Sequence, residues 1–449
     1  MEKPQTTDNA RLPARAYLVG SLTQFALGLH APFLNSYLVD MGATYAELGA
    51  FRSVGNVAPT ILQPAWGATS DRVGHTRAFV AFGTFTGLFT VYLFLWAATP
   101  LDMIVLYAIQ SILFSVQIPT WTCLIGGLMG ERNRGSELGR LGMVTNLASL
   151  IATLVSGFIA GFPGIVAALR EILGPLGQVM LPPVEAWREI YYLPFYLTAV
   201  VGISASILSL LVKEKQCPNR RRSFPPVLKL LSRPGDFRRF CFAATFFSFG
   251  MSMAWPYFII VQRVWLQNTL LEIAIASAIM TLSTVIFTIP LGWVSDRVGR
   301  QPLIILGRTL LVLVPLYYAL VLFNKSLMLI YYSNFVAGLA TAAHANASTA
   351  YIYDVAPEDE RGSHISVYNV FTGIIFLLGS LLAGLLGDAL VPFYGGQMAV
   401  FSMLMVSTVL RGVGSVMYLQ IREPREYTPH LWREILGLIH RRRHDADSV

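Results

Sequence analysis

The sequence predicts an all-α integral membrane protein with twelve transmembrane helices in two pseudo-symmetric six-helix bundles. Hydrophobic residues make up 54% of its 449 residues and charged residues only 13%, whereas a soluble protein carries about 25% charged residues. Apolar stretches of a length that crosses a bilayer recur along the chain. A string of the form G-x-x-S-D-R-V-G occurs once in each half. These three observations predict the fold class.

Twelve apolar stretches are interpreted as membrane spans. In chain order they cover residues 16–39, 48–67, 78–98, 103–129, 141–162, 192–212, 240–261, 271–294, 303–322, 327–353, 365–386 and 398–421. The segment 163–190 contains several charged residues and the prolines Pro175, Pro182 and Pro183, so it predicts a loop with room for one interfacial helix. Counting it as a span would put an odd number of spans between the two repeated strings and place them on opposite sides.

The repeated string links the two halves of the chain. Its first copy covers residues 67–74 and its second residues 292–299, at an offset of 225. The residues with candidate gating roles are Gly67, Asp71, Arg72 and Gly74 in the first copy, and Gly292, Asp296, Arg297, Gly299 and Arg300 in and directly after the second. An apolar chain with two related halves is typical of transporters that are built from repeats.

Basic residues predict the orientation in the membrane. With the amino terminus inside, the cytoplasmic segments hold 26 of the 33 Lys and Arg residues and the outer loops only 4, the bias that cytoplasmic loops show. We therefore expect a multi-pass plasma-membrane protein with both termini in the cytoplasm. The net charge of +8 then faces anionic lipid, and no nucleic-acid partner is expected.

The same pattern divides the chain into four parts. Residues 1–212 form the first six-helix bundle, 213–239 a basic cytoplasmic linker, 240–421 the second bundle and 422–449 a cytoplasmic tail. Apolar positions of the tail fall on one side of a helix, with Arg441, Arg442 and Arg443 nearby. We expect an amphipathic helix on the anionic inner leaflet; the alternative is a disordered basic tail.

These features together resemble the major facilitator superfamily, whose diagnostic motif is G-x-x-x-D-R-x-G-R-[RK] between spans 2 and 3, with a degenerate echo between spans 8 and 9. The first copy departs from it at His75, whereas the second keeps Arg300 after Gly299. The resemblance implies alternating access. It also implies a cytoplasmic latch, in which Asp71 meets the start of span 11 and Asp296 the start of span 5. The alternative is an ordinary turn between spans.

Polar residues inside spans are costly in lipid and are expected to face a cavity or a partner helix. The candidate substrate-binding residues are Gln24 and Asn35 in span 1, Arg52 and Asn56 in span 2, Gln117 and Trp121 in span 4, Trp255 in span 7 and His344 in span 10. Each has a packing alternative. For Arg52 the alternative is an ion pair at the outer gate, near Asp40 and Glu47.

Spans 1, 4, 7 and 10 contain no Asp or Glu near their middle. His30 and His344 are therefore the candidate proton carriers, because histidine titrates near neutral pH. Facilitated transport, exchange and coupling through a carboxylate at a span end remain open. For His30, packing inside the helix bundle is the alternative.

The sequence thus predicts a secondary or facilitative transporter of a small polar or amphipathic organic solute. It is expected to act as a monomer with no cofactor. A drug efflux pump is the alternative, followed by a non-transporting membrane sensor. An enzyme would need a nucleophile–base pair or a metal cluster such as H-E-x-x-H. The sequence contains no such motif, so neither catalytic residues nor a metal site are expected.

Overall fold

The computed structural model describes residues 11–129, 134–162, 164–181, 185–214, 235–357 and 360–424. At some helical positions, including 56–61, 71–72 and 134–136, it describes the backbone but not the side chains. Within these ranges the chain forms helices and no strand. The helical class predicted from the sequence is confirmed.

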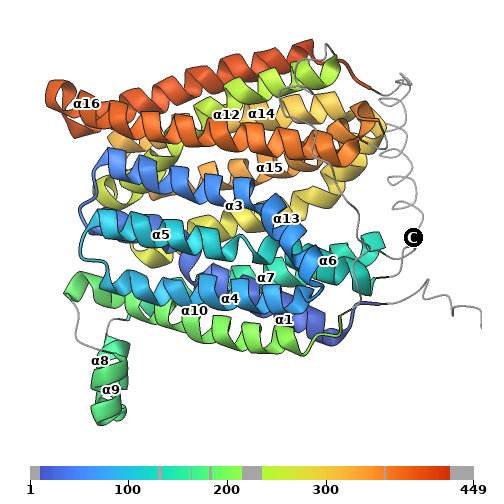
Figure 1. Cartoon of the computed structure of the whole chain (residues 1–449). Coiled ribbons are helices and arrows are strands. Elements are labelled where there is room, and N and C mark those ends of the chain that lie inside the picture. Colours follow the sequence, from blue (N-terminus) through green and yellow to red (C-terminus); the bar gives the residue numbers. More distant parts are fainter. Residues whose placement is uncertain are drawn as a thin grey trace, which may run out of the picture.

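The first half, residues 11–214, folds into long helices that lie side by side (Figure 1). Its helices are α1 (Ala14–His30), α2 (Leu34–Asp40), α3 (Tyr45–Val73), α4 (Thr76–Leu93), α5 (Pro100–Phe114), α6 (Gln117–Leu128), α7 (Arg134–Ala160) and α10 (Ala186–Leu210), with short 3₁₀ segments η1 (Ala31–Phe33) and η2 (Phe94–Trp96). Pro32 lies in η1, between α1 and α2, and has no N–H for a helical hydrogen bond. Predicted span 1 is therefore divided.

The second half, residues 235–424, lies beside the first, and in Figure 1 it runs from yellow-green to red. Its helices are α12 (Asp236–Ile260), α13 (Leu270–Val298), α14 (Arg300–Asn324), α15 (Leu327–Val355) and α16 (Arg361–Met417), with a π-helical segment η3 (Val261–Trp265) and a 3₁₀ turn η4 (Tyr418–Gln420). α16 contains two of the predicted spans. The backbone of Gly395, at φ 75° and ψ 161°, is not helical, and the chain reverses direction there.

The segment after α7 differs from the sequence-based expectation of a loop with one interfacial helix. It forms two short helices, α8 (Gly164–Ile172) and α9 (Gly174–Met180), which project away from the bundle (Figure 1). Gly174, the first residue of α9, has φ of +55°, a conformation that favours glycine. The Arg170 Nε donates to the Leu181 carbonyl at 2.7 Å, and this bond holds the turn together.

The two ends of the bundle differ in their chemistry. At one end, α3, α5 and α13 begin with capping boxes, in which Thr44 pairs with Glu47, Thr99 with Asp102 and Thr269 with Glu272. We call this the distal end. At the other end, α3 and α13 terminate at Gly74 and Gly299, and we call this the motif end because the repeated string lies there.

Eight helical stretches of the described chain are long and apolar enough to cross a membrane. They correspond to α4, α5 with α6, α7, α10, α12 with η3, α13, α14 and α16. α16 counts once although it holds two predicted spans, and α1, α3 and α15 are not among the eight. The count of twelve spans therefore stays a prediction.

Candidate functional site

At the distal end, α3 of the first half packs directly on α16 of the second. A Cβ at Gly384 would lie 2.8 Å from the Cα of Ala46, and one at Gly49 would lie 3.2 Å from the Cα of Gly384. Only glycine permits so close an approach. The Ser53 hydroxyl donates to the Leu377 carbonyl at 2.9 Å. The two halves are thus in van der Waals contact and hydrogen-bonded along this interface.

A carboxylate of the second half caps a helix of the first. Asp388 on α16 accepts hydrogen bonds from the backbone N–H of Tyr45 at 3.0 Å and of Ala46 at 2.8 Å. These N–H groups belong to the first turn of α3, where the helix dipole favours a negative charge. Next to it, the Tyr45 ring packs edge-on against Tyr257 of α12, with centroids 5.6 Å apart. Asp388 therefore ties the two halves together through a helix end.

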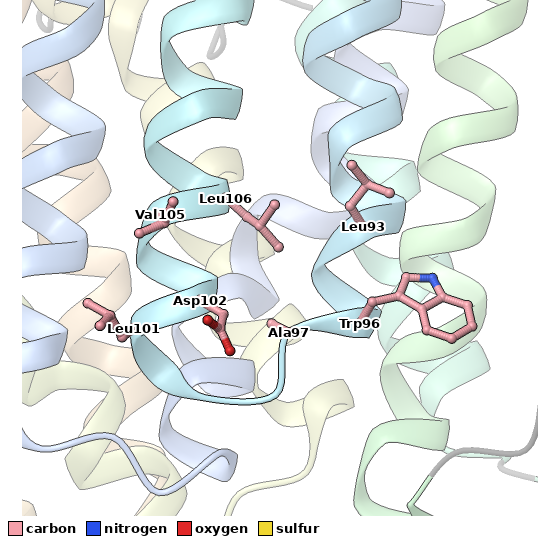
Figure 2. A pocket seen from close by; sticks show the side chains of 7 residues that line it. All are labelled: Leu93, Trp96, Ala97, Leu101, Asp102, Val105 and Leu106. Carbon is pink, nitrogen blue, oxygen red and sulfur yellow. The ribbon is translucent and has the colours of Figure 1, made fainter.

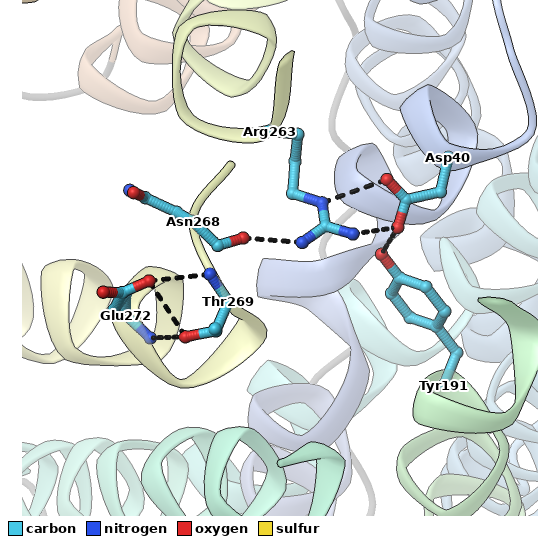
Figure 3. Close-up of polar contacts among 6 residues, drawn as sticks. All are labelled: Asp40, Tyr191, Arg263, Asn268, Thr269 and Glu272. Carbon is cyan, nitrogen blue, oxygen red and sulfur yellow. Dashed lines mark hydrogen bonds and ion pairs between the residues drawn. The ribbon is translucent and has the colours of Figure 1, made fainter. Parts of the chain in front are cut away.

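An ion pair also crosses between the halves at the distal end (Figure 3). Asp40, the last residue of α2, pairs with Arg263 of η3 through both carboxylate oxygens, one of them 3.0 Å from the Arg263 Nε. The Tyr191 hydroxyl donates to Asp40 at 2.5 Å, and the Arg263 Nη1 donates to the Asn268 carbonyl at 2.6 Å. The side chains of Asp40 and Arg263 are only 14% and 16% exposed. We call Asp40, Tyr191 and Arg263 the distal clasp.

Polar contacts described at the motif end join residues of the same half. In the first half, Glu137 accepts from the Leu12 N–H at 3.1 Å and from the Tyr17 hydroxyl at 2.9 Å. In the second half, the buried Arg300 pairs with Asp296 at 2.8 Å and with Asp354 at 3.4 Å. These contacts stiffen each half separately at this end.

The repeated string forms the last turns of α3 and of α13, and its final glycines lie just before α4 and α14. Gly74 ends α3 in the left-handed conformation, at φ 74°. The surroundings of Gly67 and the side chains of Asp71 and Arg72 are not described. In the second copy, Asp296 is 63% exposed and the Arg297 guanidinium stacks on the Trp293 ring at 3.6 Å.

The contacts proposed for the latch are only partly covered by the described side chains. Gly292 has open space where a side chain would extend, and Gly299 lies against the Glu423 side chain. The side chains at the start of α7, where Asp296 is expected to bind, are outside the described residues. The latch therefore stays a prediction.

Candidate binding residues of the first half occupy different environments. Gln24 is half-buried on α1. Asn35 on α2 is 8% exposed, and its Oδ1 has no hydrogen-bond partner. Arg52 on α3 lies near Tyr107 of α5; the acids considered for its outer-gate pair are engaged elsewhere, Asp40 with Arg263 and Glu47 in a capping box. The Asn56 side chain lies outside the described residues.

Two candidates of α6 contact neighbouring helices of their own half. Gln117 is 8% exposed, and its backbone N–H lies 2.8 Å from where a Cβ of Gly83 on α4 would be. Trp121 approaches Gly20 of α1 and packs against the apolar cluster around Leu124. These contacts show that both residues contribute to helix packing.

The remaining candidates lie on α1, α12 and α15. Trp255 on α12 packs on Phe376 of α16, with ring centroids 4.8 Å apart. His30 is 1% exposed, and its Nδ1 contacts the Ala26 carbonyl of its own helix at 2.9 Å. His344 on α15 has a buried Nδ1 without a hydrogen-bond partner and lies near Arg308 of α14. Among the described side chains, no contact brings Gln117 and His344 together, so a shared binding site stays a prediction.

A hollow of about 460 Å³ opens at the distal end between η2 and α5 (Figure 2). It is lined by Leu93, Trp96, Ala97, Leu101, Asp102, Val105 and Leu106. Trp96 and Leu101 are 57% and 62% exposed, and the Asp102 carboxylate is held in the capping box of Thr99. All lining residues belong to the first half, so this hollow is a notch in its outer surface and not a passage between the halves.

Comparison with known proteins decides the family. The profile of the Major Facilitator Superfamily matches residues 16–262 and 240–444. The chain belongs to the major facilitator superfamily. Its helices and apolar spans make it a multi-pass membrane protein, and the resemblance seen in the repeated string is confirmed.

Several superfamily relatives are similar in sequence. An uncharacterized MFS-type transporter of Methanocaldococcus jannaschii is 27% identical over 47% of this chain, and the alignment spans about half of that relative, 54%. A probable 4-methylmuconolactone transporter of Cupriavidus pinatubonensis is 24% identical over 78% of this chain and 77% of its own length. The multi-drug resistance efflux pump PmrA of Streptococcus pneumoniae is 22% identical over 86% and 90%.

Solved superfamily structures share the fold. A mutant of the nucleoside transporter NupG aligns with a TM-score of 0.71 at 14% identity, over 90% of this chain and 99% of that one. A bacterial homologue of the human lysosomal transporter Spinster, inward-facing and occupied, aligns with a TM-score of 0.69 at 15% identity, over 91% and 95%. At these identities the likeness concerns the fold alone.

Sequence reasoning missed two residues that join the halves. Arg263 is one of the four basic residues of the predicted outer loops, and Asp388 lies two positions beyond the predicted end of its span. A charged residue directly after an apolar stretch was the available signal. It marks a helix end, but it does not name the partner, which comes from the other half of the chain.

Proposed function

We propose that this superfamily member is a secondary or facilitative transporter that moves a small polar or amphipathic organic solute by alternating access. In this proposal twelve spans form two six-helix bundles in the plasma membrane, with both termini cytoplasmic and the distal end outside. The observation that carries the proposal is the set of contacts that join the two halves at the distal end: the α3–α16 packing, the Asp388 cap and the distal clasp.

Alternating access requires contacts that exist in one state and not in the other, because only such contacts bias the equilibrium between states. A solute entering from the distal side would need every contact between α3 and α16 to separate. The distal clasp would also break, since Asp40 and Arg263 belong to different halves. The conformation described here is therefore assigned to the outward-closed side of the transport cycle.

A reversible cross-link tests the proposal. Solutes that raise the apparent stability of the purified protein are identified first, because a ligand of the native state stabilises it. Ser53→Cys and Ser380→Cys, in a background with the native cysteines replaced by serine, would then be bridged across α3 and α16 by a short bis-methanethiosulfonate, which forms a reducible disulfide with each thiol and releases methanesulfinate. Uptake of an identified solute into proteoliposomes should stop on bridging and return on reduction.

The single-cysteine variants, treated with the same reagent, are the controls and should keep transporting. Transport at an unchanged rate in the bridged protein would show that the distal contacts need not separate, and the alternating-access proposal would be wrong. The residues bridged here contact each other's helices directly, so the reagent need not distort the fold.

Drug efflux is the second candidate, and a specific observation favours it. PmrA, a relative that aligns over 86% of this chain, is named a multi-drug resistance efflux pump. Expression in a drug-sensitive host would then raise resistance to several unrelated cationic or apolar compounds. A narrow solute preference in the stability screen, with unchanged drug sensitivity, would favour the first proposal instead.

A further inference from the structure

Two buried arginines lie near each other inside the second half. Arg308 on α14 is 4% exposed, and Arg411, in the part of α16 after Gly395, is 1% exposed. The two guanidinium groups interact electrostatically. Arginine is always charged, and an unpaired charge inside a membrane protein costs several kcal/mol. Some partner must therefore offset two adjacent positive charges.

Arg411 donates hydrogen bonds from two of its nitrogens to backbone carbonyls. Its Nη1 donates to the Leu311 carbonyl at 2.8 Å and its Nη2 to the Met251 carbonyl at 3.1 Å. Pro315, four residues after Leu311, lacks the N–H that would bond this carbonyl in a regular helix. Arg411 thus supplies the missing donor. Both acceptors are neutral, however, and the buried Arg411 Nε has no partner.

Arg308 is less well satisfied. Its guanidinium lies over the rings of Phe247 at 4.6 Å and Tyr418 at 5.5 Å. Within the described part of the chain its nitrogens donate no hydrogen bond and form no ion pair with a carboxylate, and its Nε is buried without a partner. A guanidinium has five N–H donors, so cation–π contacts leave most of its capacity unused.

Further unpartnered polar groups surround Arg308. His344 interacts with it electrostatically from α15, which packs closely on α14: a Cβ at Gly307 would lie 2.8 Å from the Cβ of His344. The His344 Nδ1 and the Tyr418 hydroxyl are both buried without a hydrogen-bond partner. Donors therefore converge on one region from α14, α15, η4 and the last part of α16.

We propose that Arg308, Arg411 and His344 bind one compact monovalent anion inside the second half. The shared chemistry is a small negative group, supplied either by a carboxylate of the transported solute or by free chloride. The carboxylate source rests on the proposed transport function, whereas the chloride source does not. The anion would offset the two positive charges and accept the hydrogen bonds that the protein leaves unmade.

Thermal unfolding of the purified full-length protein tests the site. Sodium chloride and sodium acetate are titrated against sodium isethionate, whose bulky anion is the reference, at constant ionic strength. A bound anion should raise Tm saturably, by about 2 °C or more at tens of Kd. A response to chloride alone assigns the site to free halide, and a larger response to acetate assigns it to a carboxylate.

Three variants separate anion binding from folding effects. Arg308→Met removes the charge but keeps the length, so its Tm should no longer respond to either anion and should equal or exceed wild type in isethionate. Arg308→Lys should keep a weaker response. Arg239→Met, which changes an exposed arginine of α12 paired with Asp236, is the matched control and should respond as wild type does.

The outcomes for the anion site and for transport are distinct. A wild-type Tm that is equal in all three salts, or an anion response retained by Arg308→Met, would overturn the site. Should the site be overturned while solute uptake persists, the transport proposal stands. An anion response in a protein that transports no solute would support the halide site and count against transport.

Discussion

The distal end and the motif end contain similar charged residues, but the contacts of these residues differ. At the distal end an arginine and two aspartates join the halves, through the clasp and the Asp388 cap. At the motif end, the described pairs of Arg300 with Asp296 and Asp354 join residues of a single half, and the residues proposed to receive Asp296 in the latch lie outside the described side chains. A salt bridge between halves biases their relative position, whereas one inside a half only stiffens it. Position relative to the interface, and not residue type, therefore decides which charges can control a conformational equilibrium.

Breaking the distal clasp should have the largest effect. Arg263→Ala removes the partner of Asp40 and leaves a largely buried carboxylate with the Tyr191 hydroxyl alone. Losing hydrogen bonds to a charged group costs about 2 kcal/mol, or about thirtyfold in population, so the outward-open state should gain by that factor. Labelling of a cysteine placed at Ser53 from the distal side would measure it.

The matched control for this variant is Arg188→Ala. Arg188 is also at the distal end, but it pairs with Glu185 and donates to the Leu95 carbonyl, both in the first half. It should leave the labelling unchanged. Equal labelling of the Arg263→Ala and Arg188→Ala proteins would mean that the clasp does not hold the halves together.

Removing the Asp388 cap should have a smaller effect. Asp388→Ala leaves the first N–H groups of α3 without their acceptor, at a cost of about 1 kcal/mol, or about fivefold in population. Asp388→Asn keeps a carbonyl acceptor and should retain most of the cap. The same labelling assay applies, and an Asn variant as open as the Ala variant would show that the charge, and not the hydrogen bond, matters.

The smallest shift is expected at the motif end, and in the opposite direction. Asp296→Asn should loosen the proposed cytoplasmic latch and favour inward opening. A contact at an exposed helix end is worth about 0.3–1 kcal/mol, or about twofold to fivefold. Labelling from the cytoplasmic side should rise by that factor, and Asp71→Asn should shift it less. If neither variant raises this labelling, the latch is falsified and the repeated string is only a turn.

The sequence was sufficient for the parts of the fold that depend on local pattern. Apolar length located the helices, and the repeated string placed the turns after α3 and α13 at the same end. The sequence pattern did not predict two separate helices in the segment 163–190. The break between them depends on the positive φ of Gly174, and the apolar pattern carries no information about that angle. Pro32, which has no N–H for a helical hydrogen bond, lies in the 3₁₀ turn η1 within predicted span 1.

The candidate site was less predictable because its contacts join distant parts of the chain. Asp40 meets Arg263 and Tyr45 meets Asp388, pairs that no periodicity along one helix can specify. Some polar residues of the predicted spans are buried, as Asn35 and Gln117 are, but Trp121 and His30 contact their own half. The residue pattern on one helix face can indicate that the face is buried. Whether the buried face meets a cavity or a neighbouring helix depends on how several helices pack.

Arg411 and Pro315 are linked through the Leu311 carbonyl, and this link predicts how the two positions change during evolution. The arginine donates to the carbonyl that the proline leaves without a helical N–H. A descendant that replaced Pro315 with an N–H-bearing residue would restore the helical bond and deprive the buried Arg411 of one acceptor. Loss of Arg411 would instead leave the Leu311 carbonyl unsatisfied. Each single step is costly and the double change is not, so the two positions should covary as the sequence diverges.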